Sequence, residues 1–315
     1  MRAIVRSAAR ALSAVAVSTA VLVAGLSSIA GATPAPLTTI QEVQQGVASG
    51  LSNHPAPQSL QRSISSIVGS LPAGYRDGCH AQGKLWPVVL PNKCTVGDPS
   101  SAQSIYLIGD SHAEQWSPGL TLAATSNHWK LTDLTMSGCV PSASTTPSTV
   151  NGNLSCQTWN HDLLKRIQKD RPKVVVVGSL LRSPEPSNAI VKYLKEVEKV
   201  ATVVLLGDTP TPGNATYCAL SHLSQPAACA FHDTQVAARA QMQSLAVEAG
   251  VASLPTFQWF CKSGRCPITT NALLLYRDNS HISTETADAL RVLLAKSLVA
   301  DAVGPGGPEL TLSQP

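Results

Sequence analysis

Short, continuous apolar runs alternate with amphipathic segments along most of this chain, and this alternation constrains the fold more than any other feature. The apolar runs are SIYLI at 104–108, KVVVVGS at 173–179 and ATVVLLGD at 201–208. Residues 159–171, 188–200 and 233–250 carry apolar side chains at helical spacing. Strands without polar alternation are typical of a parallel sheet that helices cover on both faces. We therefore expect a three-layer α/β/α sandwich around a central parallel sheet.

The first 32 residues form a segment of different composition. Arg2, Arg6 and Arg10 precede a long apolar run that ends in Ala30-Gly31-Ala32. This layout predicts a signal peptide that is cleaved after residue 32, and hence an exported protein, secreted or held in the cell envelope. An uncleaved membrane anchor is the alternative. Of the 23 basic residues, 20 lie outside this segment against 19 acidic ones, so the remaining chain lacks the charge that a nucleic-acid partner requires.

The remainder of the chain divides into three predicted parts. Residues 33–70 contain two stretches with helical spacing, separated by a break at 53–57, and are expected to form a helical extension that leans on the main domain. A flexible tether is the alternative. Residues 71–303 hold the alternating pattern and form the expected catalytic domain, which a last amphipathic helix closes. Residues 304–315 are expected to be a disordered tail.

Eight cysteines follow the predicted signal peptide, and they fall into four close couples. An even count in an exported chain favours disulfides, and each couple lies within one segment between predicted elements. Each bond would staple a loop and stabilise the fold by about 2–4 kcal/mol. Zinc is the rejected alternative, because paired C-x2-C knuckles are absent. The predicted pairs are Cys79–Cys94, Cys139–Cys156, Cys218–Cys229 and Cys261–Cys266.

A polar break follows the first apolar run of the domain, in the stretch YLIGDSH. Gly109-Asp110-Ser111 lies just past this run, and Gly178-Ser179 and Gly207-Asp208 lie just past two others. In parallel α/β sheets, ligands bind outside the carboxyl ends of the strands. Ser111 thus lies where an active site is expected, and its neighbours Asp110 and His112 are expected to order the turn and the following helix.

A serine hydroxyl becomes a nucleophile when a histidine accepts its proton and a carboxylate orients that histidine. His281 lies three residues after Asp278, in a polar loop before the last helix. Both side chains can then face one pocket, with Asp278 on one ring nitrogen and Ser111 on the other. The alternative is that Asp278 and Ser280 only end a strand and cap a helix. Arg277, beside this loop, is expected at the solvated surface.

Several longer blocks carry a resemblance that spans about residues 71–298. Together they resemble the SGNH (GDSL-like) superfamily of serine esterases and acyltransferases. Within it, the chain resembles the extracytoplasmic SGNH domain attached to membrane-bound acyltransferases of the acyltransferase-3 type, which O-acetylate cell-wall polysaccharides and peptidoglycan. The blocks are LPAGYRDGCH, CTVGDPSS, YLIGDSHAEQWSPGL, SGCVPS with CQTWN, VVLLGDTPTPG, CALSHLSQPAACAF and FCKSGRCPITTNALLLYRDNSHIS.

The resemblance implies a flavodoxin-like SGNH hydrolase fold, with Ser111 as nucleophile, His281 as general base and Asp278 as the residue that orients it. It also implies an oxyanion hole, but the chain departs from the family pattern there, because the G-x-N block is absent and VVVVGS supplies only a serine. The expected donors are the backbone N–H of Ser111 and one from the Gly138 loop, with Ser179 as a third candidate. No cofactor or metal is expected.

The resulting hypothesis is an exported, serine-dependent O-acyltransferase, expected to transfer acetyl groups to a cell-envelope glycan or glycolipid through an acyl-enzyme on Ser111. The sequence does not name the acyl donor, and a separate membrane-bound acyltransferase is the expected partner if the protein is the exported half of a split system. The same residues fit a carbohydrate or lipid esterase. A non-catalytic glycan-binding module of the same fold is the third alternative.

Overall fold

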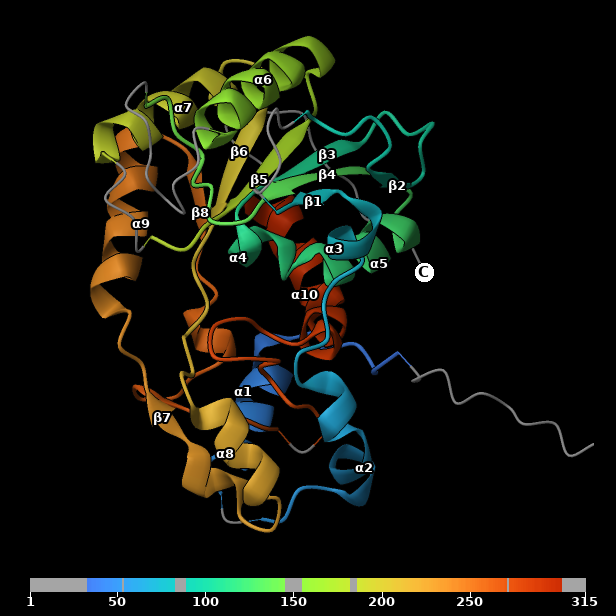
Figure 1. Ribbon diagram of the computed structural model, residues 1–315, viewed down its shortest axis with the longest axis vertical. Coiled ribbons are helices and arrows are strands. Elements are labelled where there is room, and N and C mark those ends of the chain that lie inside the picture. The colour runs from blue at the N-terminus through green and yellow to red at the C-terminus, as the bar shows by residue number, and fades with distance from the viewer. Residues whose placement is uncertain are drawn as a thin grey trace, which may run out of the picture. The chain divides into compact units, whose positions relative to one another are not determined.

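A mostly parallel β-sheet with helices on both faces forms the centre of the computed structural model (Figure 1). The structure describes residues 33–52, 54–82, 89–144, 155–181, 186–270 and 272–301. The predicted signal peptide at 1–32 and the predicted tail at 304–315 lie outside the described residues. The predicted fold class, a three-layer α/β/α sandwich, is confirmed.

The strand order of the sheet is β1-β4-β3-β5-β6-β8, and β2 also pairs with β4. The β2–β4 pair is antiparallel and the other pairs are parallel. The five core strands follow the flavodoxin-like order, which places the ligand crevice beside the carboxyl end of the first core strand, β3. The strands are β1 (His80–Ala81), β2 (Thr95–Gly97), β3 (Ser104–Gly109), β4 (Lys130–Met136), β5 (Val174–Gly178), β6 (Thr202–Leu206) and β8 (Ala252–Leu254).

Different helices cover the two faces of the sheet (Figure 1). Ile105 and Leu107 of β3 belong to the apolar cluster shared with α5 and α10, and Tyr106 and Ile108 to the cluster shared with α6, α7 and α9. Because successive residues of a strand point to opposite faces and both faces are apolar, the central strands show no polar alternation. These helices are α5 (Ser117–Ser126), α6 (Ser155–Asp170), α7 (Ser187–Glu198), α9 (Val236–Ala249) and α10 (Thr284–Asp301).

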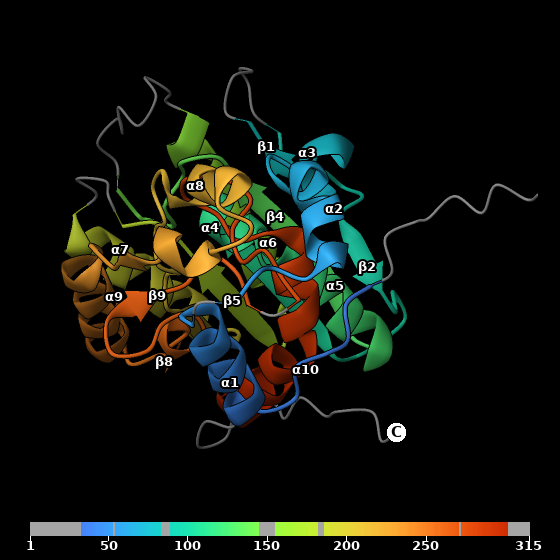
Figure 2. The same ribbon diagram turned by 90° about the horizontal axis from the view of Figure 1, so that it is seen from below.

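The segment 33–70 contains two helices, α1 (Ile40–Gly50) and α2 (Gln58–Ile67). A capping box starts α1, since Thr39 Oγ1 accepts the N–H of Glu42 and the Glu42 carboxylate accepts the N–H of Thr39. Leu60 of α2 is buried in the same apolar cluster as α10, and α1 lies beside α10 in both views (Figure 1 and Figure 2). The two helices therefore extend the apolar layer on the α10 side.

Several short elements complete the described fold. None of the helices in the described part of the chain is long and apolar enough to cross a membrane. The short elements are α3 (Gly74–Asp77), α4 (Ser111–Glu114), α8 (Ala215–Ser221), η2 (Pro226–Cys229), η3 (Phe257–Trp259) and a two-stranded sheet of β7 (Phe231–His232) and β9 (Arg265–Cys266).

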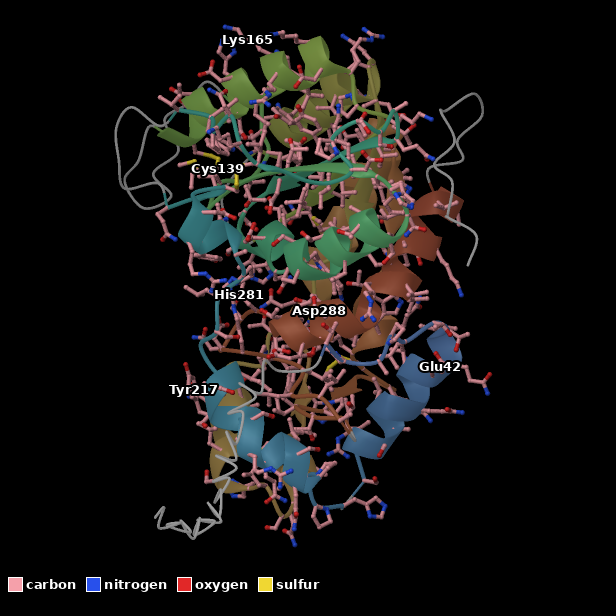
Figure 3. The ribbon with its side chains drawn as sticks, turned by 90° about the vertical axis from the view of Figure 1, so that its right-hand side faces the viewer. Glu42, Cys139, Lys165, Tyr217, His281 and Asp288 are labelled. Atoms are coloured by element: carbon pink, nitrogen blue, oxygen red, sulfur yellow. A yellow bond between two sulfur atoms is a disulfide. The ribbon has the colours of Figure 1, made fainter. Side chains whose placement is uncertain are left out.

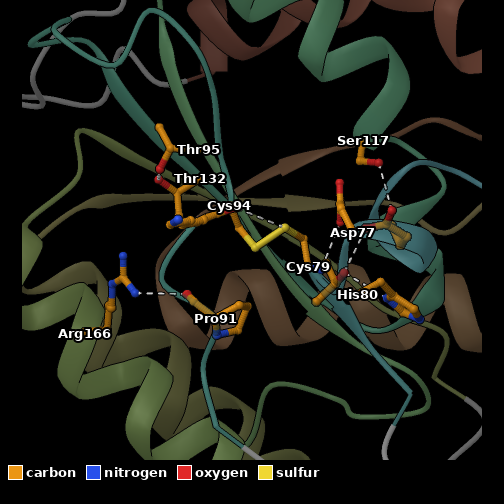
Figure 4. Close-up of a disulfide and its surroundings, with 12 residues drawn as sticks. Asp77, Cys79, His80, Pro91, Cys94, Thr95, Ser117, Thr132 and Arg166 are labelled. Atoms are coloured by element: carbon orange, nitrogen blue, oxygen red, sulfur yellow. Dashed lines mark hydrogen bonds between the residues drawn. A yellow bond between two sulfur atoms is a disulfide. The ribbon is translucent and has the colours of Figure 1, made fainter.

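Four disulfides join the pairs that the sequence predicts, Cys79–Cys94, Cys139–Cys156, Cys218–Cys229 and Cys261–Cys266. Figure 4 shows the first of them, which lies where β1 and β2 meet on the outer edge of β4. The carbonyl of Cys94 accepts the N–H of Asp133 at 2.8 Å, and that of Cys79 accepts the N–H of Thr135 at 3.3 Å. This disulfide thus holds two very short strands on one sheet edge.

Candidate active site

The turn after β3 presents Ser111 at the first position of α4. Asp110 caps this helix, because its Oδ1 accepts the N–H of His112 at 2.8 Å. The turn is tight: Gly109 has a φ of 133°, and a Cβ there would lie 1.8 Å from the carbonyl oxygen of Gly178. Only glycine allows the ends of β3 and β5 to approach this closely.

Three side chains from distant parts of the chain meet beside this turn, and Figure 3 labels the histidine among them. Ser111 Oγ lies 2.8 Å from His281 Nε2, and His281 Nδ1 lies 2.9 Å from Asp278 Oδ2. The structure therefore brings together the three residues that the sequence singles out. In this order, an imidazole can accept the hydroxyl proton while the carboxylate holds the ring in the required tautomer.

The loop that carries Asp278 and His281 is held at several points. The backbone N–H of Arg277 donates to the carbonyl of His281 at 3.0 Å and so joins the two ends of the loop. From the α8 side, Thr216 Oγ1 donates to the Asp278 carbonyl at 2.8 Å, and the N–H of Gly213 donates to the Asn279 carbonyl at 3.1 Å. Backbone contacts, rather than the side chains alone, thus position the two residues.

The pKa shifts of Asp278 and His281 suit proton transfer. Burial acts to raise the pKa of Asp278, but hydrogen bonds from the His281 ring and from the backbone N–H groups of Ser280 and His281 lower it well below its usual 3.8. Burial lowers the pKa of His281 below 6.5; Asp278 opposes this shift, and His112 and Arg277 add to it. His281 is therefore neutral at pH 7 and able to accept a proton.

Arg277 corrects an expectation from the sequence, which places it at the solvated surface. Its side chain is 1 % exposed. Nε donates to Asp278 Oδ2 at 3.2 Å, Nη1 donates to the carbonyl of Ser70 at 3.3 Å, and the guanidinium lies 5.5 Å from the centre of the Tyr75 ring. A buried guanidinium requires such partners, and Ser70, 207 residues away in sequence, could not be seen from the local pattern.

The sequence predicts two backbone N–H groups as oxyanion donors, those of Ser111 and Gly138. In the described part of the chain, neither the Ser111 N–H nor the Gly138 N–H has a protein acceptor. The hydroxyl of Ser179, the third candidate, instead donates to Asp110 Oδ2 at 3.0 Å, beside the N–H of Leu180 at 2.9 Å. Its side chain therefore joins the ends of β3 and β5.

A second histidine and a second aspartate lie behind the triad of side chains. His112 Nδ1 is 2.6 Å from Asp208 Oδ1, and both side chains are almost fully buried. The sequence assigns His112 only to the ordering of the turn. The position of Asp208 just past a strand, like those of Ser111 and Ser179, was the one signal that could have placed it at the site.

One group of potential metal ligands occurs among the described residues outside this site, formed by Cys218, His222 and Cys229. Cys218 and Cys229 are bonded to each other. Since a metal is bound by thiolates and not by disulfide sulfurs, this group does not fit a metal centre while the bond is intact.

Comparison with known protein families gives a match over residues 78–296 to the family described as SGNH domain (fused to AT3 domains). The match covers more than half of the chain and includes Ser111, Asp278 and His281. This chain belongs to the SGNH domain family. The resemblance inferred from the sequence blocks is thereby confirmed.

Among solved structures, this SGNH domain is similar to the lipopolysaccharide acetyltransferase periplasmic domain of Salmonella ser. Paratyphi A. The TM-score is 0.52, with 15 % sequence identity over 76 % of this chain and 93 % of that chain. At this identity the likeness shows the fold alone. Comparison with curated protein sequences finds no match.

Proposed function

We propose that this SGNH domain is an O-acyltransferase of the cell envelope, with Ser111 as nucleophile, His281 as general base and Asp278 as the residue that orients the base. The observation that carries the proposal is the unbroken hydrogen-bond path from Ser111 Oγ through both ring nitrogens of His281 to Asp278 Oδ2. The acyl group is acetyl, and the acceptor is a hydroxyl of a glycan or glycolipid. The family's fusion to AT3 domains and the named activity of the Salmonella protein support this choice.

The reaction proceeds in two balanced steps. Ser111 Oγ attacks the acyl carbonyl and passes its proton to His281 Nε2; the bond to the leaving group breaks, and the leaving group takes that proton. The acyl-enzyme ester is then attacked by an acceptor hydroxyl whose proton goes to His281 Nε2. Breakage of the ester bond returns this proton to Ser111 Oγ and releases the acylated acceptor.

The developing oxyanion needs donors in both steps. We assign the backbone N–H groups of Ser111 and Gly138 to this role, since neither has an acceptor among the residues that the structure describes. Ser179 contributes only if its hydroxyl leaves Asp110 Oδ2. Loss of one such donor costs about 10²–10³ in rate in serine hydrolases, so the two N–H groups are expected to be essential.

The proposed setting is outside the cytoplasm. The predicted signal peptide at 1–32 and the four disulfides fit an exported, oxidised environment. The proposed partner is a membrane-bound acyltransferase of the AT3 type, which would deliver acyl groups to the SGNH domain.

The direct test combines p-nitrophenyl acetate as donor with a panel of neutral sugars as acceptors. We expect acetylated sugar, detected by mass spectrometry, from wild type and none from Ser111→Ala. Ser126→Ala, at the end of α5, is the matched control and should behave as wild type. A wild-type chain that also resists labelling by a fluorophosphonate would instead favour the non-catalytic glycan-binding module.

An esterase is the second candidate, and the exposure of the base favours it. The side chains of His281 and Asp278 are 17 % and 24 % exposed, so water can reach the acyl-enzyme. Water would then give its proton to His281 Nε2 and release free acid. Ester hydrolysis whose rate and products are unaffected by any sugar acceptor would establish the esterase over the transferase.

A further inference from the structure

Ser280, in the loop between Asp278 and His281, is bound by the second histidine of the site. His112 Nε2 lies 3.0 Å from Ser280 Oγ, and His112 Nδ1 lies 2.6 Å from Asp208 Oδ1. Asp208 is 96 residues from His112 and reaches it from the turn after β6, where its Oδ1 also accepts the N–H of Thr209 at 2.8 Å. A carboxylate, an imidazole and a hydroxyl thus form a second row beside the proposed triad.

The two rows are joined into a ring around the reacting hydroxyl. His112 follows Ser111 directly in α4, and its ring centre lies 4.8 Å from that of His281. The N–H of Ser280 donates to Asp278 Oδ1 at 2.7 Å. His112 is therefore tied to the nucleophile through the chain, to the base through ring contact and to the orienting carboxylate through Ser280. The loop cannot shift against α4 without breaking one of these contacts.

Several charged groups lie around His112 and His281. Asp208 faces one ring nitrogen, and Asp110 accepts the His112 backbone N–H. The His281 ring contacts the His112 ring, and Asp278 pairs with both His281 and Arg277. The two rings lie close enough that a charge on His112 opposes a proton on His281. The lowering of the His281 pKa by His112 has this cause.

We propose that His112 and Asp208 are positioning residues for the proposed acyl transfer. They hold Ser280 and the Asp278–His281 loop against Ser111, and the closeness of the His112 ring to the His281 ring opposes a proton on the base. This inference rests on the proposed function for its kinetic effect. Its electrostatic part concerns the titration of His281 and can be measured without turnover.

The kinetic test follows hydrolysis of p-nitrophenyl acetate by the full chain between pH 5 and 9. Wild type is expected to lose kcat/KM on the acidic side below pH 6.5, where His281 takes up a proton. In His112→Gln and in Asp208→Asn, the acidic limb moves to higher pH because the opposition from the His112 ring is gone or weakened. At the optimum, kcat falls about 10- to 100-fold with KM nearly unchanged, as expected for a displaced base.

Two further variants separate the effect of the loop's position from the electrostatic effect of His112 on His281. Ser280→Ala keeps the His112–Asp208 pair and removes only the link to the loop, so kcat should fall while the acidic limb stays in place. His232→Gln, an exposed histidine on β7, is the matched control and should change neither quantity. If His112→Gln does not fold, Asp208→Asn, which preserves the shape of the side chain, decides the question.

A titration of the histidine ring signals by NMR distinguishes failure of this inference from failure of the proposed function. The His281 midpoint should rise in His112→Gln and Asp208→Asn, even if no ester is turned over. Folded variants with a wild-type His281 midpoint and a wild-type acidic limb would overturn the inference. Absence of any Ser111-dependent turnover of the ester in wild type, by transfer to a sugar or by hydrolysis, would overturn the proposed function and leave the titration result standing.

Discussion

The Asp278 carboxylate faces His281 Nδ1 and supplies the negative charge of the proposed triad. Asp278→Asn keeps the size of this side chain but removes the charge, and its amide can donate to Nδ1 and select the wrong tautomer of the ring. We expect kcat for p-nitrophenyl acetate to fall about 10⁴-fold, with KM nearly unchanged. Asp162→Asn on α6 is the matched control. A loss of less than tenfold in Asp278→Asn would contradict the assigned role.

Individual residues of this site differ in how far the sequence could predict them. Ser111 follows an apolar run at the position where a parallel sheet presents ligands, so its place in the pattern indicated it. His281 was selected by its spacing from Asp278 in a polar loop, together with the resemblance to the SGNH superfamily. The burial of Arg277 and the pairing of His112 with Asp208 depend on how separate loops fold against each other. No periodicity records such contacts, and they had to be read from the structure.

At the scale of secondary-structure elements, α4 packs on β4 through two buried carboxyl groups, Glu114 and Asp133. Burial, followed by the charge of Glu114 and its hydrogen bond, raises the pKa of Asp133 well above 3.8. Burial also raises the pKa of Glu114, against hydrogen bonds from residues that include Thr135 and Ser117. The raised pKa of Asp133 beside Glu114 predicts that this pair holds a proton in the folded state.

This pair predicts a pH dependence of stability. A carboxyl pKa that is raised in the folded state gives stability that is present below the unfolded-state value near 4 and is lost as pH rises through the folded-state pKa. Asp133→Asn should therefore melt at a higher temperature than wild type at pH 7.5, and this difference should shrink toward pH 4. Asp162→Asn should follow wild type. Melting curves of Asp133→Asn that coincide with wild type at both pH values would contradict the shared proton.

A disulfide that closes a longer loop should stabilise this fold more than one that closes a shorter loop. Cys139–Cys156 spans 17 residues and Cys261–Cys266 spans five. Loop-closure entropy predicts losses in the free energy of unfolding of about 3 and about 2 kcal/mol, respectively, when each pair is replaced by alanines. Both pairs are buried, so the comparison is matched. Urea unfolding at pH 7 measures it, and a larger loss for the shorter loop would count against the entropic account.

Short elements mark the limit of sequence-based prediction at this scale. The central strands are continuous apolar runs and the long helices have a clear period. β1, β2, β7 and β9 have two or three residues each and show neither signal. β1 and β2 exist because the edge of β4 pairs with them and the Cys79–Cys94 bond holds them there. Their strand conformation is thus set by tertiary contacts rather than by local propensity.

At the scale of the whole molecule, the segment 33–70 bears on the site as well as on the core. The N–H of Gly69 donates to the Arg277 carbonyl at 2.8 Å, and Arg277 Nη1 donates to the Ser70 carbonyl. Arg277 in turn contacts Asp278. Two hydrogen bonds therefore link the end of this segment to the loop of the proposed base. A flexible tether would not need such bonds.

This linkage predicts that the segment and the sheet unfold together. Leu60→Ala in α2 removes a fully buried side chain and should lower the free energy of unfolding by about 2–5 kcal/mol. Leu71→Ala, at a side chain that is 44 % exposed, is the matched control and should change it by less than about 0.5 kcal/mol. Tryptophan fluorescence and ester hydrolysis should be lost in one coincident transition in both variants. Two separate transitions in Leu60→Ala, with activity retained after the first, would show that the segment is an independent unit.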